Sequence, residues 1–316
     1  MRHVPNLQSF SSEELHDILR ISAEIKASPA DYHHTLSHLT MAMLFQKTST
    51  RTRVSFEAGM TELGGHAIYV DWTTSNFVLS GIGHETAYLS RNVSFIMARL
   101  MRHDDLQTIM GASEVPVING CDEKFHPCQA LTDVLTMQEN FEGDIADAHL
   151  VYVGVQNNVS NSLVTLCHKL GIQLTLATPT PDDNGESQDA YVQDIISGAT
   201  PSKSPTQKRI QHTEDAKAAV QEADFVYTDT WIDMQYFNNP AHQDENDAKL
   251  KKMMPYQLNH ELLKGVACKV MHDMPIHDGF EISAELARDE RAIIYPQAAN
   301  RMHAQKGLLV WLNEQH

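Results

Sequence analysis

One short stretch, FQKTSTRTRVSF at residues 45–56, concentrates groups that can bind an anion. Lys47, Arg51 and Arg53 supply positive charge. Four side-chain hydroxyls lie among them, on Thr48, Ser49, Thr50 and Thr52. A guanidinium matches two phosphate oxygens at once, and hydroxyls can donate to further oxygens. These residue types at this spacing favour a site for phosphate or a phosphate-like anion; the alternative is a solvated helix start with two surface arginines.

The elements around this stretch place it at the end of a strand. The apolar run 41–45 predicts a buried strand, and 54–63 predicts a helix that Gly64 and Gly65 end. A helix that starts near Thr50 directs free N–H groups and the positive end of its dipole toward a ligand. Ligands bind at the carboxyl ends of strands in parallel sheets. The GxxxxGK[ST] pattern is absent, so this is not a Walker A loop.

A second polar cluster is FHPCQ at 125–129, at the start of a predicted helix over 129–140. His126 can donate a hydrogen bond to a carbonyl oxygen or to an oxygen that gains negative charge. Gln129 can pair with an amide NH2 group. Taken alone, His126 is interpreted as an ordinary histidine at a helix start. The cluster gains meaning only together with the other motifs of the chain.

The second half of the chain adds further polar groups at strand ends and helix starts. They are Asn157 and Asn158 after a predicted strand at 150–154, Asp229 and Asp233 after one at 224–227, MHDMP at 271–275, and Asn300 and Arg301 at the start of a last helix. Asp229 and Asp233 are placed to hold an ammonium group. The GxGxxG glycines of a dinucleotide site are absent after Val153. A nucleotide-dependent dehydrogenase is therefore disfavoured.

Strands that alternate with helices predict an α/β fold with mostly parallel sheets covered by helices. Strands are expected at 41–45, 67–70, 95–97, 115–118, 150–154, 173–177 and 224–227, and helices at 12–27, 54–63, 129–140 and 300–313. Ser11 and Glu14 have the spacing of a capping box at the first helix. The polar stretch 179–207 is expected to be mostly a surface excursion.

Length and composition set further limits. The chain has 316 residues, which fits two domains, and a net charge of -17, which disfavours nucleic acid as a partner. No apolar run is long enough to span a membrane, and the first residues lack a signal core, so we expect a cytoplasmic protein. The four cysteines are scattered, and the 18 histidines show no clear ligand spacing. We therefore expect no disulfide and no metal site.

Taken together, these motifs resemble the aspartate/ornithine carbamoyltransferase family, with the ornithine branch closest. STRTR at 49–53 and HPCQ at 126–129 match the family's STRTR and HPxQ. NN at 157–158, TDTWIDM at 228–234 and HDMP at 272–275 look like the branch motifs NN, TDxWxSM and HCLP. The resemblance covers nearly the whole chain in order.

The resemblance implies two α/β domains and a role in arginine metabolism. Residues 1–141 would form the carbamoyl-phosphate domain, 142–297 the amine-acceptor domain, and the helix at 298–316 would pack back on the first. It also implies a homotrimer in which the loop 72–84 reaches a neighbouring active site. The only other partners implied are carbamoyl phosphate and a small amine. A non-catalytic paralogue that binds carbamoyl phosphate as a sensor or structural subunit is the alternative.

The family's site residues carry over position by position. The carbamoyl-phosphate ligands would be Ser49, Thr50, Arg51, Thr52, Arg102, His126, Gln129 and Arg301, with Arg99 as a competitor for the place of Arg102. The acceptor ligands would be Asn157, Asn158, Asp229, Asp233, Met234 and Asp273. The chemistry would fall to Arg102, His126, His272 and Asp273. In the implied reaction an uncharged amine attacks the carbamoyl carbon and phosphate leaves, and no metal or organic cofactor is needed.

The chain departs from the ornithine branch on the acceptor side. Asp273 replaces the Cys of HCLP, and Asp233 replaces the Ser of TDxWxSM. Together with Asp229 they would place three carboxylates around the amine, so at least one carboxyl pKa should rise. A cationic acceptor relieves this repulsion, which favours ornithine or a related basic amine over aspartate. In particular we expect an acceptor that is more cationic than ornithine or held differently, such as putrescine, another diamine or a diamino acid. Asp273 either takes a proton from the ammonium group or only orients the amine; both interpretations stay open.

Overall fold

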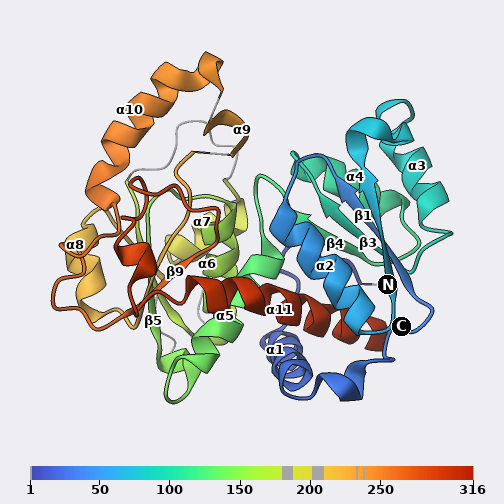
Figure 1. Cartoon of the computed structure of the whole chain (residues 1–316), viewed down its shortest axis with the longest axis horizontal. Helices are drawn as coiled ribbons and strands as arrows, with labels where there is room; N and C mark the ends of the chain where they lie inside the picture. Colours follow the sequence, from blue (N-terminus) through green and yellow to red (C-terminus); the bar gives the residue numbers. More distant parts are fainter. Residues whose placement is uncertain (1, 180–187, 201–209, 233, 238, 316) are drawn as a thin grey trace. The chain divides into compact units, whose positions relative to one another are not determined.

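The computed structural model describes residues 2–179, 188–200, 210–232, 234–237 and 239–315. The chain divides into two compact units (Figure 1). The first unit comprises Met1–Thr136 and Ala299–His316, and the second comprises Met137–Ala298. Each unit contains one parallel sheet with helices, which confirms the predicted α/β fold class.

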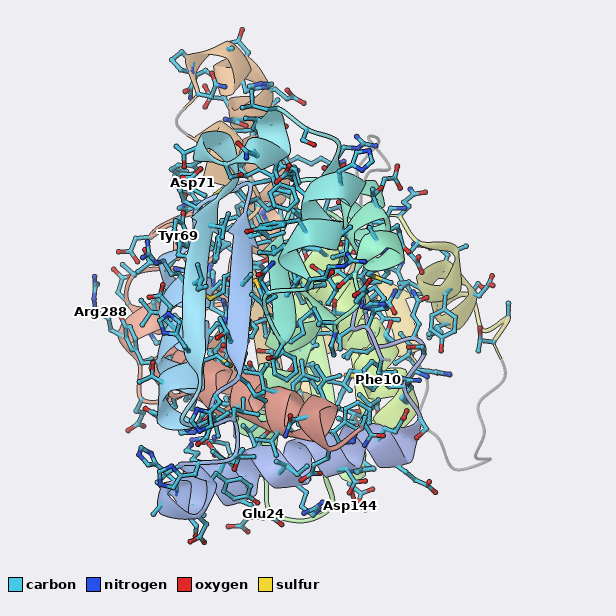
Figure 2. All side chains as sticks on the ribbon, turned by 90° about the vertical axis from the view of Figure 1, so that its right-hand side faces the viewer. Phe10, Glu24, Tyr69, Asp71, Asp144 and Arg288 are labelled. Atoms are coloured by element: carbon cyan, nitrogen blue, oxygen red, sulfur yellow. The ribbon has the colours of Figure 1, made fainter. Side chains whose placement is uncertain are left out.

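The sheet of the first unit has four parallel strands in the order β2-β1-β3-β4. Their bounds are β1 Thr40–Phe45, β2 His66–Asp71, β3 Phe95–Arg99 and β4 Val117–Cys121. The central strands β1 and β3 are almost wholly buried, as expected for strands covered on both faces. The edge strand β2 is only partly buried, and Figure 2 shows Tyr69 and Asp71 along it.

Six α-helices contribute residues to the first unit. They are α1 Ser12–Ala27, α2 Thr50–Glu62, α3 Ile82–Leu89, α4 His103–Ala112, α5 Pro127–Glu139 and α11 Ile294–Glu314, of which α5 and α11 also continue into the second unit. Short 3-10 turns occur at Pro29–Tyr32, Trp72–Thr74 and Asn76–Val78. The capping box predicted for α1 is confirmed, because Glu14 N–H donates to Ser11 Oγ (3.1 Å) and Ser11 N–H donates to Glu14 Oε2 (2.7 Å).

The C-terminal part of α11 packs closely against α1 within the first unit (Figure 1). The close approach depends on Gly307, since a Cβ atom there would lie 2.0 Å from Ser22 Oγ and 2.8 Å from the Ile18 carbonyl oxygen. Polar contacts join this end of α11 to other helices of the unit. Lys306 Nζ pairs with Glu62 Oε2 on α2 (2.6 Å), and Asn300 Nδ2 donates to Thr136 Oγ1 on α5 (3.0 Å).

The sheet of the second unit has five parallel strands in the order β7-β6-β5-β8-β9. Their bounds are β5 His149–Val153, β6 Gln173–Ala177, β7 Ile210–Thr213, β8 Phe225–Thr228 and β9 Lys269–His272. In the register of the neighbouring strands β8 and β9, Thr228 pairs with His272. The residues that follow these two strands, Asp229 and Asp273, therefore leave the same edge of the sheet side by side.

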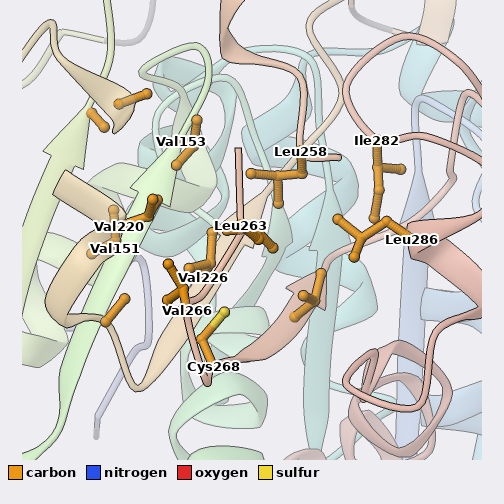
Figure 3. Packing of buried hydrophobic residues seen from close by; sticks show 14 of the residues in the cluster. Val151, Val153, Val220, Val226, Leu258, Leu263, Val266, Cys268, Ile282 and Leu286 are labelled. Carbon is orange, nitrogen blue, oxygen red and sulfur yellow. The ribbon is translucent and has the colours of Figure 1, made fainter. Parts of the chain in front are cut away.

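The helices of the second unit and the turns between them surround this sheet. The α-helices are α6 Asn158–Leu170, α7 Ala190–Ile196, α8 Ala216–Ala219, α9 Met234–Phe237 and α10 Gln243–Met253, and 3-10 turns occur at Ile145–Asp147, Val220–Glu222, Pro240–His242, Met254–Tyr256 and Leu286–Arg288. Valines of β5 and β8 pack with apolar side chains from the segments before and after β9 (Figure 3). Val151, Val226 and Leu258 are fully buried in this cluster.

Several elements differ from those expected from the sequence. The strand expected at 115–118 begins later and runs over Val117–Cys121, and the last helix begins earlier, at Ile294. The strands β7 and β9 and the helix α6 were not predicted. Residues 180–187 and 201–207 of the expected surface excursion lie outside the described residues, but α7 forms within it.

Candidate active site

The anion-binding stretch lies where β1 ends and α2 begins. Ser49 is the N-cap of α2, and its Oγ accepts a hydrogen bond from Thr52 N–H (3.3 Å). The same hydroxyl donates to Thr52 Oγ1 (3.1 Å), so the two hydroxyls lie together at the first turn. Thr52 is buried. Hydroxyls at the first turn of a helix, beside its free N–H groups, provide donors for phosphate oxygens.

An arginine from the neighbouring strand completes this first group. Arg99 is the last residue of β3 and pairs with Phe45 in the sheet register, directly beside the end of β1. Its side chain is buried, and Nη1 donates to Thr52 Oγ1 (3.4 Å). Arg102, to which the sequence assigned this place, has a side chain that is 68% exposed and lies 3.9 Å from Asp104. The structure thus brings Arg99 to the hydroxyl group and leaves Arg102 at the surface.

The two arginines of STRTR differ in their surroundings. Arg53 donates to Glu57 Oε1 (3.1 Å) and lies over the ring of Tyr69, 3.9 Å from its centre. These contacts hold Arg53 on the outer side of α2, next to the edge strand. Arg51 is half-buried at the first turn of α2. Of the two arginines, Arg51 is therefore the one placed beside the hydroxyls, because it lies in the same first turn of α2.

The HPCQ segment also lies in the first unit, after β4. His126 is buried and directly precedes α5, and its carbonyl oxygen accepts from Gln129 N–H (3.1 Å). The side chain of Gln129 is buried and donates through Nε2 to Asp133 Oδ1 (2.7 Å). Its Oε1 accepts a hydrogen bond from Nη2 of the buried Arg301 on α11. Gln129 and Arg301, which are far apart in the sequence, are therefore in direct contact.

The acceptor-side residues lie in the second unit, at the carboxyl edge of its sheet. Asn157 is the N-cap of α6, and its Oδ1 accepts from Val159 N–H (3.0 Å). Its Nδ2 donates to Asp229 Oδ2 (2.7 Å), and Thr230 N–H donates to Asp229 Oδ1 (2.8 Å). Asn158 is the first residue of α6. The cap of α6 and the end of β8 are thus tied together through Asp229.

The charge of Asp229 is disfavoured by its surroundings. Burial, followed by the nearby charge of Asp273, raises the pKa of Asp229 to about 7, while His272 and the two hydrogen bonds act in the opposite direction. The expected rise in a carboxyl pKa is confirmed here, although burial contributes more than the repulsion on which the expectation was based. Near neutral pH this carboxyl group can exchange a proton with its surroundings.

His272 occupies a fully buried position at the end of β9. Its Nδ1 accepts from Met274 N–H (2.7 Å), and its Nε2 lies 3.1 Å from Glu281 Oε1. An Nδ1 atom that accepts cannot carry a hydrogen, so Nε2 carries it and donates to Glu281. The backbone N–H of His272 donates to Gln297 Oε1 (2.9 Å). With both ring nitrogens engaged in the protein, His272 orients the segment of Asp273.

Two predicted acceptor residues add nothing to this geometry. Asp233 lies outside the described residues, and Met234 is described only as the first residue of α9.

Among the residues that the structure describes, no group of three or more His, Cys, Asp or Glu side chains could hold a metal ion. No helix in the described part of the chain is long and apolar enough to cross a membrane.

The resemblance placed the family's arginine about fifty residues after STRTR, which favoured Arg102 and left Arg99 as its competitor. A strand that continues to Arg99 puts this residue at the carboxyl edge of the sheet, which is the signal that could have identified it. The sequence analysis also did not single out Asp122, which belongs to the turn before His126, or His103, which contacts Asp122. Their one sequence signal was their position, one after a strand and the other at a helix start.

Comparisons with known proteins match each half of the chain to a domain of one family. Residues 2–139 match the family model "Aspartate/ornithine carbamoyltransferase, carbamoyl-P binding domain", and residues 146–312 match "Aspartate/ornithine carbamoyltransferase, Asp/Orn binding domain". The chain is 36% identical over 320 residues to an ornithine carbamoyltransferase of Archaeoglobus fulgidus, covering 99% of this chain and 97% of that protein. It is 42% identical over 277 residues to one of Haloquadratum walsbyi, covering 86% and 85%.

Solved structures show the same likeness. The ornithine carbamoyltransferase from Pyrococcus furiosus is 35% identical with a TM-score of 0.86, covering 98% of this chain and 96% of that one. The ornithine transcarbamoylase from Giardia lamblia is 26% identical with a TM-score of 0.85, covering 100% and 99%. The likeness therefore extends over both units of the chain.

Proposed function

The chain belongs to the aspartate/ornithine carbamoyltransferase family, and from this premise we propose that it transfers the carbamoyl group of carbamoyl phosphate to ornithine. The observation that carries the proposal is a group of polar side chains in the first unit, most of them buried. Arg99 and Ser49 converge on Thr52, and Arg301 contacts Gln129 in the same unit. The relatives named above as ornithine carbamoyltransferases support ornithine as the acceptor.

We propose that carbamoyl phosphate binds in the first unit. Its phosphate is held by Ser49, Thr50 and Arg51 and by the free N–H groups of α2. Its carbonyl oxygen accepts from Thr52, Arg99 and His126, which stabilise the negative charge that develops on attack. Gln129, oriented by Asp133 and Arg301, accepts from the carbamoyl NH2 group. Arg99 replaces Arg102 in this set because its side chain is buried beside Thr52.

We propose that ornithine binds in the second unit, with Asp229 and Asn157 as ligands of its α-amino and carboxyl ends and with Asp273 beside the reacting amine. The ammonium group loses a proton, and the neutral amine then attacks the carbamoyl carbon. A C–N bond forms, the C–O bond to phosphate breaks, and phosphate leaves with the bonding pair and takes up the second proton that the attacking nitrogen gives up. The lost proton goes to Asp273, or Asp273 only orients the amine while water takes it.

Steady-state phosphate release tests this function with carbamoyl phosphate and a panel of amines. Ornithine should give turnover that Arg51→Ala abolishes, whereas aspartate should give none. Putrescine has two cationic ends, and lysine has one methylene more than ornithine. Their rates of turnover measure how strictly the site selects its acceptor. Tight binding of carbamoyl phosphate without turnover for any amine would instead support the non-catalytic paralogue.

We also propose that the chain forms a homotrimer. Exposed apolar side chains of the first unit support an interface between copies, among them Val54 (56%), Ile68 (43%), Val78 (52%) and Leu79 (83%). Two of the four lie in the loop 72–84, which we propose reaches the active site of the neighbouring copy. Sedimentation gives the oligomeric state. His84 is the last residue of this loop and is exposed. Activity regained on mixing His84→Ala with Arg51→Ala chains tests whether one copy completes another's site.

A further inference from the structure

The turn between β4 and His126 is organised around one buried carboxylate, Asp122. Its Oδ1 accepts from Lys124 N–H (2.8 Å) and from Phe125 N–H (2.7 Å), and its own N–H donates to the Phe125 carbonyl oxygen (3.1 Å). Both backbone polar groups of Phe125 therefore bond to Asp122. Phe125 directly precedes His126, so these bonds fix the peptide that carries His126 into α5.

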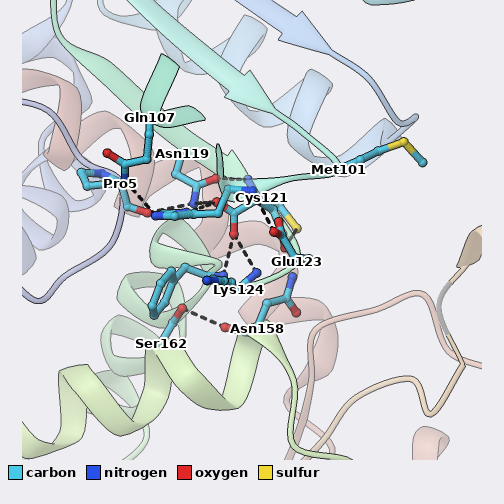
Figure 4. Close-up of polar contacts among 12 residues, drawn as sticks. Pro5, Met101, Gln107, Asn119, Cys121, Glu123, Lys124, Asn158 and Ser162 are labelled. Atoms are coloured by element: carbon cyan, nitrogen blue, oxygen red, sulfur yellow. Dashed lines mark hydrogen bonds and ion pairs between the residues drawn. The ribbon is translucent and has the colours of Figure 1, made fainter. Parts of the chain in front are cut away.

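The other oxygen of Asp122 is held by two side chains from outside the turn. Asn119 Nδ2 donates to Asp122 Oδ2 (2.8 Å), and His103 Nδ1 lies 2.7 Å from the same atom. Asn119 cannot turn its amide round, because its Oδ1 accepts from Cys121 N–H (3.0 Å) and its Nδ2 also donates to the Pro5 carbonyl oxygen (2.8 Å). Figure 4 shows this arrangement around Asn119, Cys121 and Lys124.

His103 joins this turn to the start of α4. Its backbone N–H donates to Glu123 Oε1 (2.8 Å), and its ring lies edge-on to Phe125, with 5.6 Å between the ring centres. Its Nε2 lies 2.9 Å from Gln107 Nε2. The nearby charged groups that act on the ring are Asp122, Glu123 and Lys124. Burial alone would lower the pKa of His103, but its hydrogen bond to Asp122 and the acidic charges raise it overall.

We propose that Asp122, held by His103, is a positioning residue for His126 in carbamoyl transfer. The inference rests on the proposed function, in which His126 donates to the carbonyl oxygen of carbamoyl phosphate. His103 fixes the side chain of Asp122, Asp122 fixes both backbone groups of Phe125, and the next residue is His126. Neither His103 nor Asp122 needs to touch the substrate, because a donor displaced by a fraction of an ångström stabilises the oxyanion less.

Two substitutions of His103 separate positioning from simple packing. His103→Asn keeps a nitrogen donor at the same place on the side chain as Nδ1, whereas His103→Leu removes it. Gln107→Leu is the matched control, because it removes the other partner of the ring and leaves the bond to Asp122. Asp122→Asn is a fourth variant. Its new NH2 group would face the NH2 group of Asn119, and the amide of Asn119 cannot turn away.

The experiment measures kcat and KM for both substrates in the full chain, with the melting temperature recorded for each variant. His103→Leu and Asp122→Asn should lower kcat/KM for carbamoyl phosphate about tenfold or more with an unchanged KM for ornithine. His103→Asn and Gln107→Leu should stay within about threefold of wild type. Full activity in His103→Leu, or equal losses in the Leu and Asn variants, would overturn the proposal.

A second readout keeps the test independent of turnover. The ring signals of His126, followed by NMR during titration with carbamoyl phosphate alone, should shift in wild type and His103→Asn and shift less in His103→Leu. If His103→Leu does not fold, Asp122→Asn takes its place in this comparison. Identical His126 responses in all folded variants would overturn the proposal. Absence of ornithine turnover in wild type would refute the proposed function. The His126 ring signals would then still decide whether His103 and Asp122 position His126.

Discussion

Arg99 Nη1 donates to Thr52 Oγ1 across 3.4 Å, which joins the end of β3 to the first turn of α2. The contact follows from the sheet register, because Phe45 at the end of β1 pairs with Arg99. Two neighbouring parallel strands thus deliver a hydroxyl and a guanidinium to one place. This placement favours Arg99 over Arg102 as the arginine that acts on the carbamoyl group.

Arg99→Ala should therefore lower kcat/KM for carbamoyl phosphate by about 10² to 10³, the usual cost of removing one donor to an oxyanion. Arg102→Ala is the control on the same segment, and its exposed side chain predicts a change within about threefold. Steady-state kinetics with varied carbamoyl phosphate compares the two. A larger loss in Arg102→Ala than in Arg99→Ala would reverse the assignment.

The raised pKa of Asp229 predicts a titration near neutral pH. Because burial and Asp273 raise this pKa from 3.8 to about 7, the folded state holds a proton that the unfolded state releases. The stability from this proton is complete below about pH 4 and is lost as pH rises to about 7. Asp229→Asn should remove this part of the pH dependence, as measured by urea unfolding between pH 4 and 8.

Asp273→Asn should shift the titration of Asp229, as observed in the pH dependence of the kinetics. Without the charge of Asp273, the pKa of Asp229 should fall, because one of the two causes that raise it is gone. The corresponding inflection in the pH profile of kcat/KM for ornithine should then move to lower pH. An unmoved inflection would show that the two carboxyl groups do not interact, and a kcat that stays at the wild-type value would exclude Asp273 as the base.

His272 should keep one tautomer with and without bound substrates. Since Nδ1 accepts from Met274 N–H, the hydrogen lies on Nε2 and points to Glu281. Nitrogen-15 chemical shifts of the ring give the tautomer directly, with and without ligands. A hydrogen on Nδ1, or a tautomer that changes when substrates bind, would support a direct role of His272 in the reaction.

Gly307→Ala should destabilise the first unit, because its Cβ would overlap Ser22 and the Ile18 carbonyl oxygen. Overpacking of this kind costs about 1–3 kcal/mol, and more if the helices cannot separate. Gly111→Ala is the matched control, since a Cβ there meets nothing within 4 Å. In helix α4 it should be neutral or stabilise by up to about 1 kcal/mol. Denaturant unfolding of both variants decides whether the close contact of α1 and α11 matters.

Much of the fold could be predicted from local patterns. β6 has the expected bounds, and the capping box at Ser11 begins α1 as expected, because each depends on residues close together in the sequence. The short strands β7 and β9 could not be identified this way. β7 is an edge strand with the partly exposed sequence IQHT, and β9 has the sequence KVMH, in which only two successive residues are apolar, so neither shows a long apolar run. Helix α6 buries Ser, Thr and Asn with its apolar residues, which hides its apolar face.

The candidate site was predictable where a motif is contiguous. Ser49 and Thr52 share one helical turn, so their proximity follows from spacing alone. The contact of Arg301 with Gln129 depends on the return of α11 to the first unit, and no local pattern contains it. The same holds for His103 and Asp122, which meet only because β4 lies beside β3 and α4 follows β3.

The most direct test of carbamoyl transfer follows the carbamoyl carbon itself. Carbamoyl phosphate labelled with carbon-13 is incubated with ornithine and the full chain, and the products are identified by NMR and mass spectrometry. We expect the label to appear on an amine of ornithine together with one phosphate for each label transferred, and Arg99→Ala to slow both equally. Labelled carbon that stays in carbamoyl phosphate or its spontaneous breakdown products, with wild-type protein shown to be folded, would contradict it.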